Sequence, residues 1–128
     1  MATPAKPLDA GTRLAADRTW LAHERTLMAW VRTATSLISF GFTLYKFFQL
    51  EAARGAPDTS RLLSPRAFAM IMIGTGLVAL LLSAIEHRQN MRLLHEEFGT
   101  TRRSTAGVVA SIVSVMGLLA FVAALLRG

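Results

Sequence analysis

Five charged or hydroxyl side chains recur at every seventh position in the first half of the chain. They are Arg18, Arg25, Arg32, Ser39 and Lys46. Seven residues make almost two turns of an α-helix, so this row would form one slowly turning stripe along a helix. None of the three arginines has an acidic residue three or four positions away, where an ion pair within the helix would form. The guanidinium groups are therefore available to lipid phosphates, to another helix or to an anionic ligand.

Guanidinium groups bind phosphate oxygens through paired, charge-assisted hydrogen bonds. If several copies of the helix surrounded a common axis, the row would become stacked rings of positive charge. Such rings are expected of a pore that selects anions or phosphates. We therefore take Arg18, Arg25, Arg32 and Lys46 as candidate ligand-binding residues.

A simpler interpretation of the same residues stays open. Arginines often gather at the cytoplasmic end of a first membrane helix and set its orientation, a role that Arg18 and Arg25 also fit. Arg32 follows Trp30 and enters the edge of the hydrocarbon region, where a charge is costly, which favours a ligand or inter-helix role. Lys46 also fits an anchor whose long side chain reaches the far membrane surface.

Glu24 is a carboxylate without a basic partner at helical spacing in its own segment. A partly buried carboxylate needs a partner, so we expect Glu24 to pair with another segment. Arg88 and Arg92 follow the second apolar segment on the same side of the membrane, one helical turn apart. The sequence predicts a structural ion pair between Glu24 and one of these arginines rather than a catalytic acid.

Other chemistry has little support in the sequence. The chain has no cysteine, which excludes disulfides, thiolate metal sites and cysteine nucleophiles. Its histidines, His23, His87 and His95, lack the spacing of metal ligands. There is no nucleophile–base constellation and no phosphate-binding loop of the Walker type. We therefore expect no enzyme, no cofactor, no metal and no nucleic-acid partner.

The elements that must position these residues are three apolar segments. The chain is 52% hydrophobic and only 17% charged, which favours a membrane protein. Segments of about 20 mostly apolar residues can cross a bilayer as helices, and they occur at about 27–50, 67–85 and 106–126. We expect an all-α fold of three transmembrane helices, the first extending into the cytoplasm and the second continuing to Gly99. Residues 1–12 form a flexible arm, and 13–128 form the membrane domain.

The distribution of basic residues predicts the orientation. The arm and the second loop carry eight Lys and Arg residues on one side, against four in the first loop and at the C-terminus. Because positive charge is enriched on the cytoplasmic side, the N-terminus is expected inside and the C-terminus outside. The net charge of +6 also fits attraction to anionic headgroups or to an anion.

The stretch LAHERTLMAWVRTATSLISFGF at 21–42 resembles the signature of the YidH-type family of small bacterial inner-membrane proteins, a domain of unknown function. The matching residues are Leu21, Ala22, Glu24, Arg25, Thr26, Ala29, Trp30, Arg32, Thr33 and Ala34, and His23 stands where the signature has Asn. The run EHRQNMRLL also looks like a basic segment of that family. The domain is similar to the membrane part of the vacuolar transporter chaperone, which implies a multi-subunit ring whose first helices line a basic polyphosphate path.

We therefore expect a homo-oligomer with a basic cytoplasmic vestibule that binds, and conducts, an anion such as phosphate or polyphosphate. Small residues at three- and four-residue steps in the second and third segments favour close helix packing and more than one copy. A ring of five copies is favoured over three or four. The alternative is a non-conducting scaffold or regulatory subunit that assembles with another protein. An intramembrane enzyme has the least support.

Overall fold

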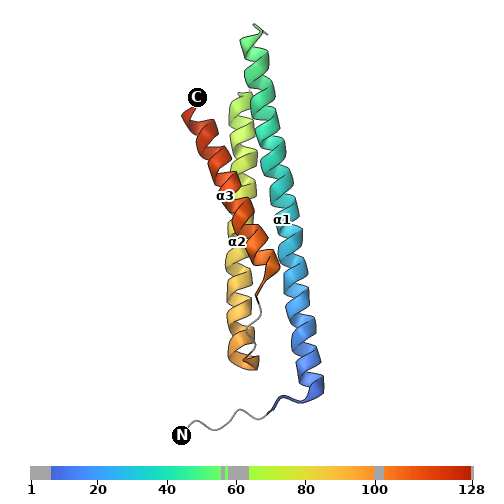
Figure 1. The fold of residues 1–128 in the computed structure, drawn as a ribbon. Helices are drawn as coiled ribbons and strands as arrows, with labels where there is room; N and C mark the ends of the chain where they lie inside the picture. The colour runs from blue at the N-terminus through green and yellow to red at the C-terminus, as the bar shows by residue number, and fades with distance from the viewer. Residues whose placement is uncertain (1–6, 56, 58–63, 100–102, 128) are drawn as a thin grey trace.

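The computed structural model describes residues 7–55, 57, 64–99 and 103–127. All regular structure in this part of the chain is helical: α1 spans Ala10–Ala53, α2 spans Pro65–Phe98 and α3 spans Thr105–Leu126 (Figure 1). Each helix is long and apolar enough to cross a membrane. The predicted all-α, three-span fold is confirmed. The 44 residues of α1 give a length of about 66 Å, roughly twice the hydrocarbon thickness, so that α1 extends well beyond the bilayer.

The helix ends agree with the chemistry of the residues found there. Ser64 caps α2 by accepting a hydrogen bond from the Ala67 amide, and Pro65 occupies the first helical turn. The predicted extension of the second helix is confirmed, since α2 ends where Gly99 adopts a left-handed backbone conformation with φ 65°. α1 begins at Ala10, earlier than the predicted membrane domain, because no proline interrupts the chain between Pro7 and the end of α1. Residues 1–6 of the predicted arm lie outside the described residues.

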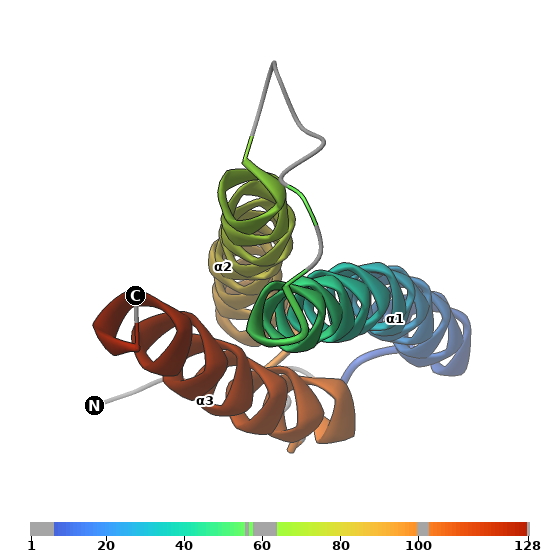
Figure 2. The ribbon, with the colours of Figure 1, turned by 90° about the horizontal axis from the view of Figure 1, so that it is seen from above.

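The two long helices run antiparallel and side by side, and α3 crosses one side of this pair (Figures 1 and 2). α1 begins and α2 ends at the same end, which we call the N-terminal end of the bundle, and α3 begins part-way along the pair and runs away from that end. α3 contacts both other helices. The short α3 thus covers one flank of the α1–α2 pair and leaves the other flank open.

The buried residues of α1 and α2 follow steps of three and four residues. On α1 they are Leu27, Val31, Ala34, Ile38, Gly41 and Tyr45, and on α2 they are Ala69, Ile73, Gly76, Leu80, Ser83 and His87. This alternation marks a seam of the coiled-coil type. Because the seam repeats every seven residues, each of the remaining heptad positions on α1 also keeps a constant direction relative to α2 and α3.

Two glycines let the backbones of α1 and α2 approach closely. A Cβ atom on Gly41 would lie 2.8 Å from the Ile73 side chain and 3.0 Å from the Ala69 carbonyl oxygen. A Cβ on Gly76 would lie 3.0 Å from the Ile38 side chain. Each helix therefore places an isoleucine over the glycine of the other. Small residues at helix contacts are the main means of close packing in lipid.

A methyl group at Gly41 should push α1 and α2 apart at this contact. We expect Gly41→Ala to destabilise the bundle by about 1–3 kcal/mol, the usual cost of overpacking. The matched control is Gly74→Ala, whose new Cβ would meet only Phe121 at an ordinary 3.9 Å. The thermal midpoint in detergent should fall for Gly41→Ala and hold or rise for Gly74→Ala. Equal midpoints would contradict the close approach.

Candidate functional site

One face of α1 is polar along its whole predicted span. It carries Arg18, Ala22, Arg25, Ala29, Arg32, Ser36, Ser39, Thr43 and Lys46, all exposed except the half-buried Lys46, and we call this set the polar stripe. The stripe contains the predicted heptad row and adds two hydroxyl side chains between its members. It holds no large apolar residue. From Arg18 to Lys46 it covers about 42 Å along the helix, more than the thickness of the hydrocarbon core.

The heptad packing of α1 explains why the arginines are exposed. Arg25 and Arg32 each follow a residue that faces the other helices, Glu24 and Val31, and one residue turns a helix by about 100°. Val31 is 5% exposed, whereas the arginine side chains are open to the surroundings. The seam that buries Val31 therefore directs the arginines outward.

The guanidinium groups of the stripe have no protein partner among the residues that the structure describes. No ion pair there contains Arg18, Arg25 or Arg32, and Lys46 donates a weak 3.3 Å hydrogen bond to Gln49. The hydroxyl groups are instead satisfied locally. Ser36 donates to the Arg32 carbonyl oxygen at 3.0 Å, and Thr43 donates to that of Ser39 at 2.8 Å. The structure thus brings together all four predicted ligand-binding residues on one face, with their charges free for an outside partner.

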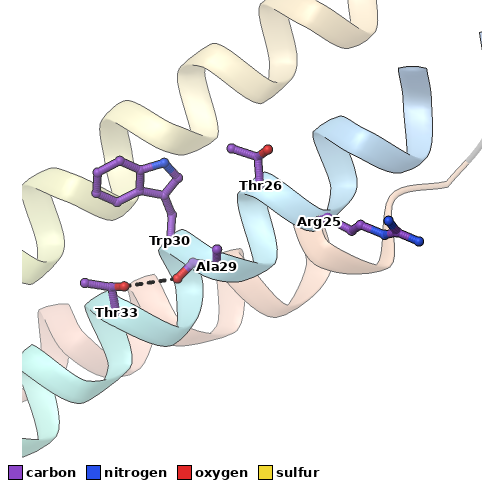
Figure 3. Close-up of a pocket in the computed structure, with 5 residues that line it drawn as sticks. All are labelled: Arg25, Thr26, Ala29, Trp30 and Thr33. Atoms are coloured by element: carbon purple, nitrogen blue, oxygen red, sulfur yellow. Dashed lines mark hydrogen bonds between the residues drawn. The ribbon is translucent and has the colours of Figure 1, made fainter. Parts of the chain in front are cut away.

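A shallow hollow of about 400 Å³ lies on the outer face of α1, between Arg25 and Trp30. Thr26, Ala29 and Thr33 form its floor. Figure 3 shows the Trp30 ring reaching toward α2 while the Arg25 side chain points away from it. The hollow is open and small for a ligand that must be enclosed by one copy. It is better suited to be one wall of a larger site.

Glu24 faces inward and caps the N-terminus of α3. One carboxylate oxygen accepts a 2.7 Å hydrogen bond from the Ala106 amide, and the other accepts a 2.8 Å bond from the Ser104 hydroxyl. Ser104 is also the N-cap of α3, accepting from the Gly107 amide at 2.9 Å. A negative charge is favourable at this end of a helix because the unpaired amides give it partial positive charge.

These partners differ from the predicted ones. Arg88 and Arg92 are exposed, and among the described residues neither forms an ion pair with Glu24. The inward position of α2 at this depth belongs to His87, whose Nε2 lies 3.7 Å from a Glu24 oxygen. Arg88 is one residue further along and points about 100° away. A serine directly before an apolar run is a helix-start signal, so Ser104 could have been found from the sequence, whereas the contact with Glu24 could not.

His87 completes the polar cluster. The single proton of the Ser104 hydroxyl goes to Glu24, so the His87 Nε2–H donates to the Ser104 oxygen, 3.0 Å away. Its Nδ1 is buried and has no hydrogen-bond partner in the part of the chain that the structure describes. His87 lies beyond the apolar span that ends at Ile85. Its pKa is lowered below the ordinary 6.5, chiefly because burial disfavours the charged form; Glu24 raises it and His23 lowers it.

The opposite end of α3 is held by a charge of the opposite sign. Arg66, near the start of α2, donates hydrogen bonds to the carbonyl oxygens of Ala124 and Leu125 at 3.2 and 3.4 Å. A cation there complements the partial negative charge of a helix C-terminus. Arg66 is one of the four basic residues of the first loop and the C-terminus that enter the charge count for orientation, and its contact with α3 was not predicted. Both ends of α3 are therefore docked to the α1–α2 pair by side chains of complementary charge.

The family described as "Domain of unknown function (DUF202)" matches residues 18–93, more than half of the chain. The chain belongs to the DUF202 family. This YidH-like family is the one whose signature the first helix resembles. The chain matches no curated protein and no solved structure. The DUF202 match begins at the first arginine of the polar stripe and includes Glu24 and His87, while α3 with Ser104 lies beyond it.

Removing the charge of Glu24 should loosen the docking of α3 in this DUF202 protein. We expect Glu24→Gln to cost about 1.5–3 kcal/mol, because hydrogen bonds to a charged acceptor are lost or weakened. Glu96→Gln, at an exposed position of α2, is the matched control and should be neutral. The measurement is the thermal midpoint of both variants in detergent. If Glu24→Gln and Glu96→Gln have the same thermal midpoint, the Glu24 carboxylate does not stabilise the docking of α3.

Acid should weaken the same cluster through His87. Above its ordinary pKa of 6.5, His87 is neutral in both the folded and the unfolded protein. As the pH falls, the unfolded chain takes up the proton first, because the pKa of His87 is lower in the folded protein. The thermal midpoint should therefore decrease when the pH is lowered below about 6.5. His87→Gln should flatten this dependence, and His95→Gln, at an exposed histidine of α2, should keep it. A midpoint that rises on acidification of the wild type would show that Glu24 dominates over burial.

Proposed function

We propose that the protein is a subunit of a homo-oligomer in which the polar stripes of several copies face a common axis and bind an anion such as phosphate or polyphosphate. The observation that carries this proposal is the polar stripe itself. A single copy would expose it to lipid along the whole span, where a charge such as Arg32 is expensive. Around an axis, the same side chains face each other and a polar interior.

The chemistry along the stripe favours an anion. Arg18, Arg25 and Arg32 supply guanidinium groups at intervals of about 10 Å, each able to bind phosphate oxygens bidentately. Glu24, the acid next to Arg25 on α1, is turned inward against α3. Beyond Arg32 the stripe continues with hydroxyl groups and ends near Lys46. This order, with guanidinium groups at one end, hydroxyl groups through the membrane and the Lys46 ammonium at the other end, suits binding and conduction of an anion without chemical conversion.

The orientation and location belong to the same proposal. The excess of basic residues beside the N-terminal end favours a cytoplasmic N-terminus and an outside C-terminus. The likeness to YidH-type proteins favours a bacterial inner membrane. In this orientation the arginines form a basic vestibule that faces cytoplasmic phosphate compounds. A ring of five copies is our preferred stoichiometry.

A scaffold function is favoured by one specific observation. Several hydroxyl groups of the exposed α1 face are already bonded to their own backbone, including Thr33 to the Ala29 oxygen at 3.1 Å. Hydroxyls satisfied in this way tolerate contact with another apolar helix. In that case the polar stripe would dock a separate protein, and its arginines would form ion pairs with that protein rather than with a small anion.

Polyphosphate binding distinguishes the two functions. Successive phosphates should meet successive arginine rings, so we expect the affinity of the wild type to rise with chain length and to fall with salt, which screens charges over about 8–10 Å. Replacing Arg25 and Arg32 together by Gln should weaken long-chain binding at least about tenfold, a loss of roughly 1.4 kcal/mol. Isothermal titration with short and long chains at two salt concentrations measures this.

The matched control replaces Arg88 and Arg92 by Gln. This variant loses the same charge at the same end of the bundle, but from the exposed surface of α2. It should keep the dependence on chain length. Equal affinity of the wild type for short and long chains, or equal losses in the two double variants, would contradict anion binding by the polar stripe.

A further inference from the structure

The flank of the α1–α2 pair opposite α3 carries an open groove of about 670 Å³. Trp30 forms its α1 wall, and its α2 wall includes Val78, Ala79, Leu82 and Glu86. Of the α2 residues beside α3, Leu77 and His87 lie outside the groove, whereas Gly74 lies at its edge, where a Cβ would meet Phe121 of α3 at 3.9 Å. Ala79 is two residues, or about 200°, from Leu77. The groove therefore lies mainly on the side of the pair away from α3, which Figure 2 shows on one side only, and Gly74 stands at the boundary between them.

The outer face of α3 is apolar and exposed. Its large side chains are Val108, Ile112, Val115, Met116 and Leu119, each between 56 and 66% exposed. The ridge from the first to the last of these residues covers about 16 Å along the helix. The groove from Glu86 to Ile71 extends over about 22 Å, long enough to receive it.

We propose that α3 of one copy packs into the α1–α2 groove of the next copy around the ring. This inference rests on the proposed ring and specifies how its copies meet. With the polar stripe toward the axis, α3 lies on one flank of α1 and the Trp30 groove on the other flank. A contact between two different surfaces, repeated by rotation, closes into a ring.

Charge complementarity supports α3 of the neighbouring copy as the segment that fills the groove. Ser104 contacts His87 within one copy, which places their neighbours Arg103 and Glu86 at nearly the same membrane depth. Rotation about the membrane normal preserves depth, so Arg103 of one copy would arrive beside Glu86 of the next. Both side chains are exposed, and among the described residues neither forms an ion pair. An acyl chain in the groove would leave both charges without a partner.

The apolar part of the interface can be aligned in the same way. A Cβ on Gly117 would lie 2.8 Å from the Leu77 side chain, so these two residues share one depth. Ile112 and Leu82 are each five residues nearer to the N-terminal end on helices that run in opposite directions. They are therefore at matching depth, 56 and 62% exposed, and too far apart to meet within one copy because they lie on opposite flanks.

Disulfide cross-linking tests this pairing directly, because the natural chain has no cysteine. The variant with Leu82→Cys and Ile112→Cys, reconstituted in lipid and oxidised, should give a ladder from dimer up to one closed ring on non-reducing gels. The control with Leu81→Cys and Ile112→Cys keeps an exposed cysteine one residue away and outside the groove. It should remain mostly monomeric, and so should each single variant.

Each other outcome overturns the interface in a distinguishable way. If the uncross-linked protein is an oligomer by native mass spectrometry but Leu82→Cys/Ile112→Cys gives no ladder, the groove is not the interface and the proposed anion-binding ring stands. A single variant that cross-links to a dimer and no further indicates a two-fold contact and excludes the head-to-tail arrangement. A wild type that is monomeric in lipid excludes both the interface and the ring.

Discussion

The hydrogen bonds that Glu24 accepts from Ser104 and from the Ala106 amide are the constraint on which the rest of the arrangement depends. They fix where α3 begins relative to α1. They also fix the rotation of α1, because a carboxylate in the seam must point at the start of α3. Once Glu24 points inward, the next residue, Arg25, has to point outward. The direction of the whole arginine row therefore follows from one half-buried, inward-facing carboxylate.

α3 is the element that most needs such docking. It is shorter than its neighbours, almost wholly apolar and crosses the other two helices instead of running along them. In lipid, apolar contacts between helices gain little over contacts with acyl chains, so polar interactions and close packing determine position. Glu24 at one end and Arg66 at the other supply the polar interactions. Gly117 supplies close packing, since a Cβ there would overlap with Ile38 and Leu77.

Much of this fold follows from the sequence alone. The features that could not be predicted from it share one cause. Length and hydropathy predict three spans, Gly99 predicts the end of α2, and the seven-residue period predicts that Arg18, Arg25 and Arg32 share a face. The partner of Glu24 was predicted in kind, as a group on another segment, but not in identity. The alignment of α1 with α2 determines the residue of α2 that faces Glu24. This alignment is set by close contacts such as that of Ile73 with Gly41. A pattern within one segment carries no information on that alignment.

The packed face and the polar face of α1 follow the same seven-residue period. Every seven residues, a position that packs against α2 or α3 is followed by a position that carries a charge or a hydroxyl group, as in Val31 with Arg32 and Ile38 with Ser39. The packed face is satisfied by the chain's own helices. The polar face is not, because none of the helices in the described part of the chain covers it and the outer faces of α2 and α3 within the predicted spans are apolar. In the proposed ring, copies of this polar face with water or an anion between them would give it an environment of matching polarity along the full span. One seven-residue repeat on α1 thus directs the packing of the fold on one side and leaves a polar, uncovered surface on the other.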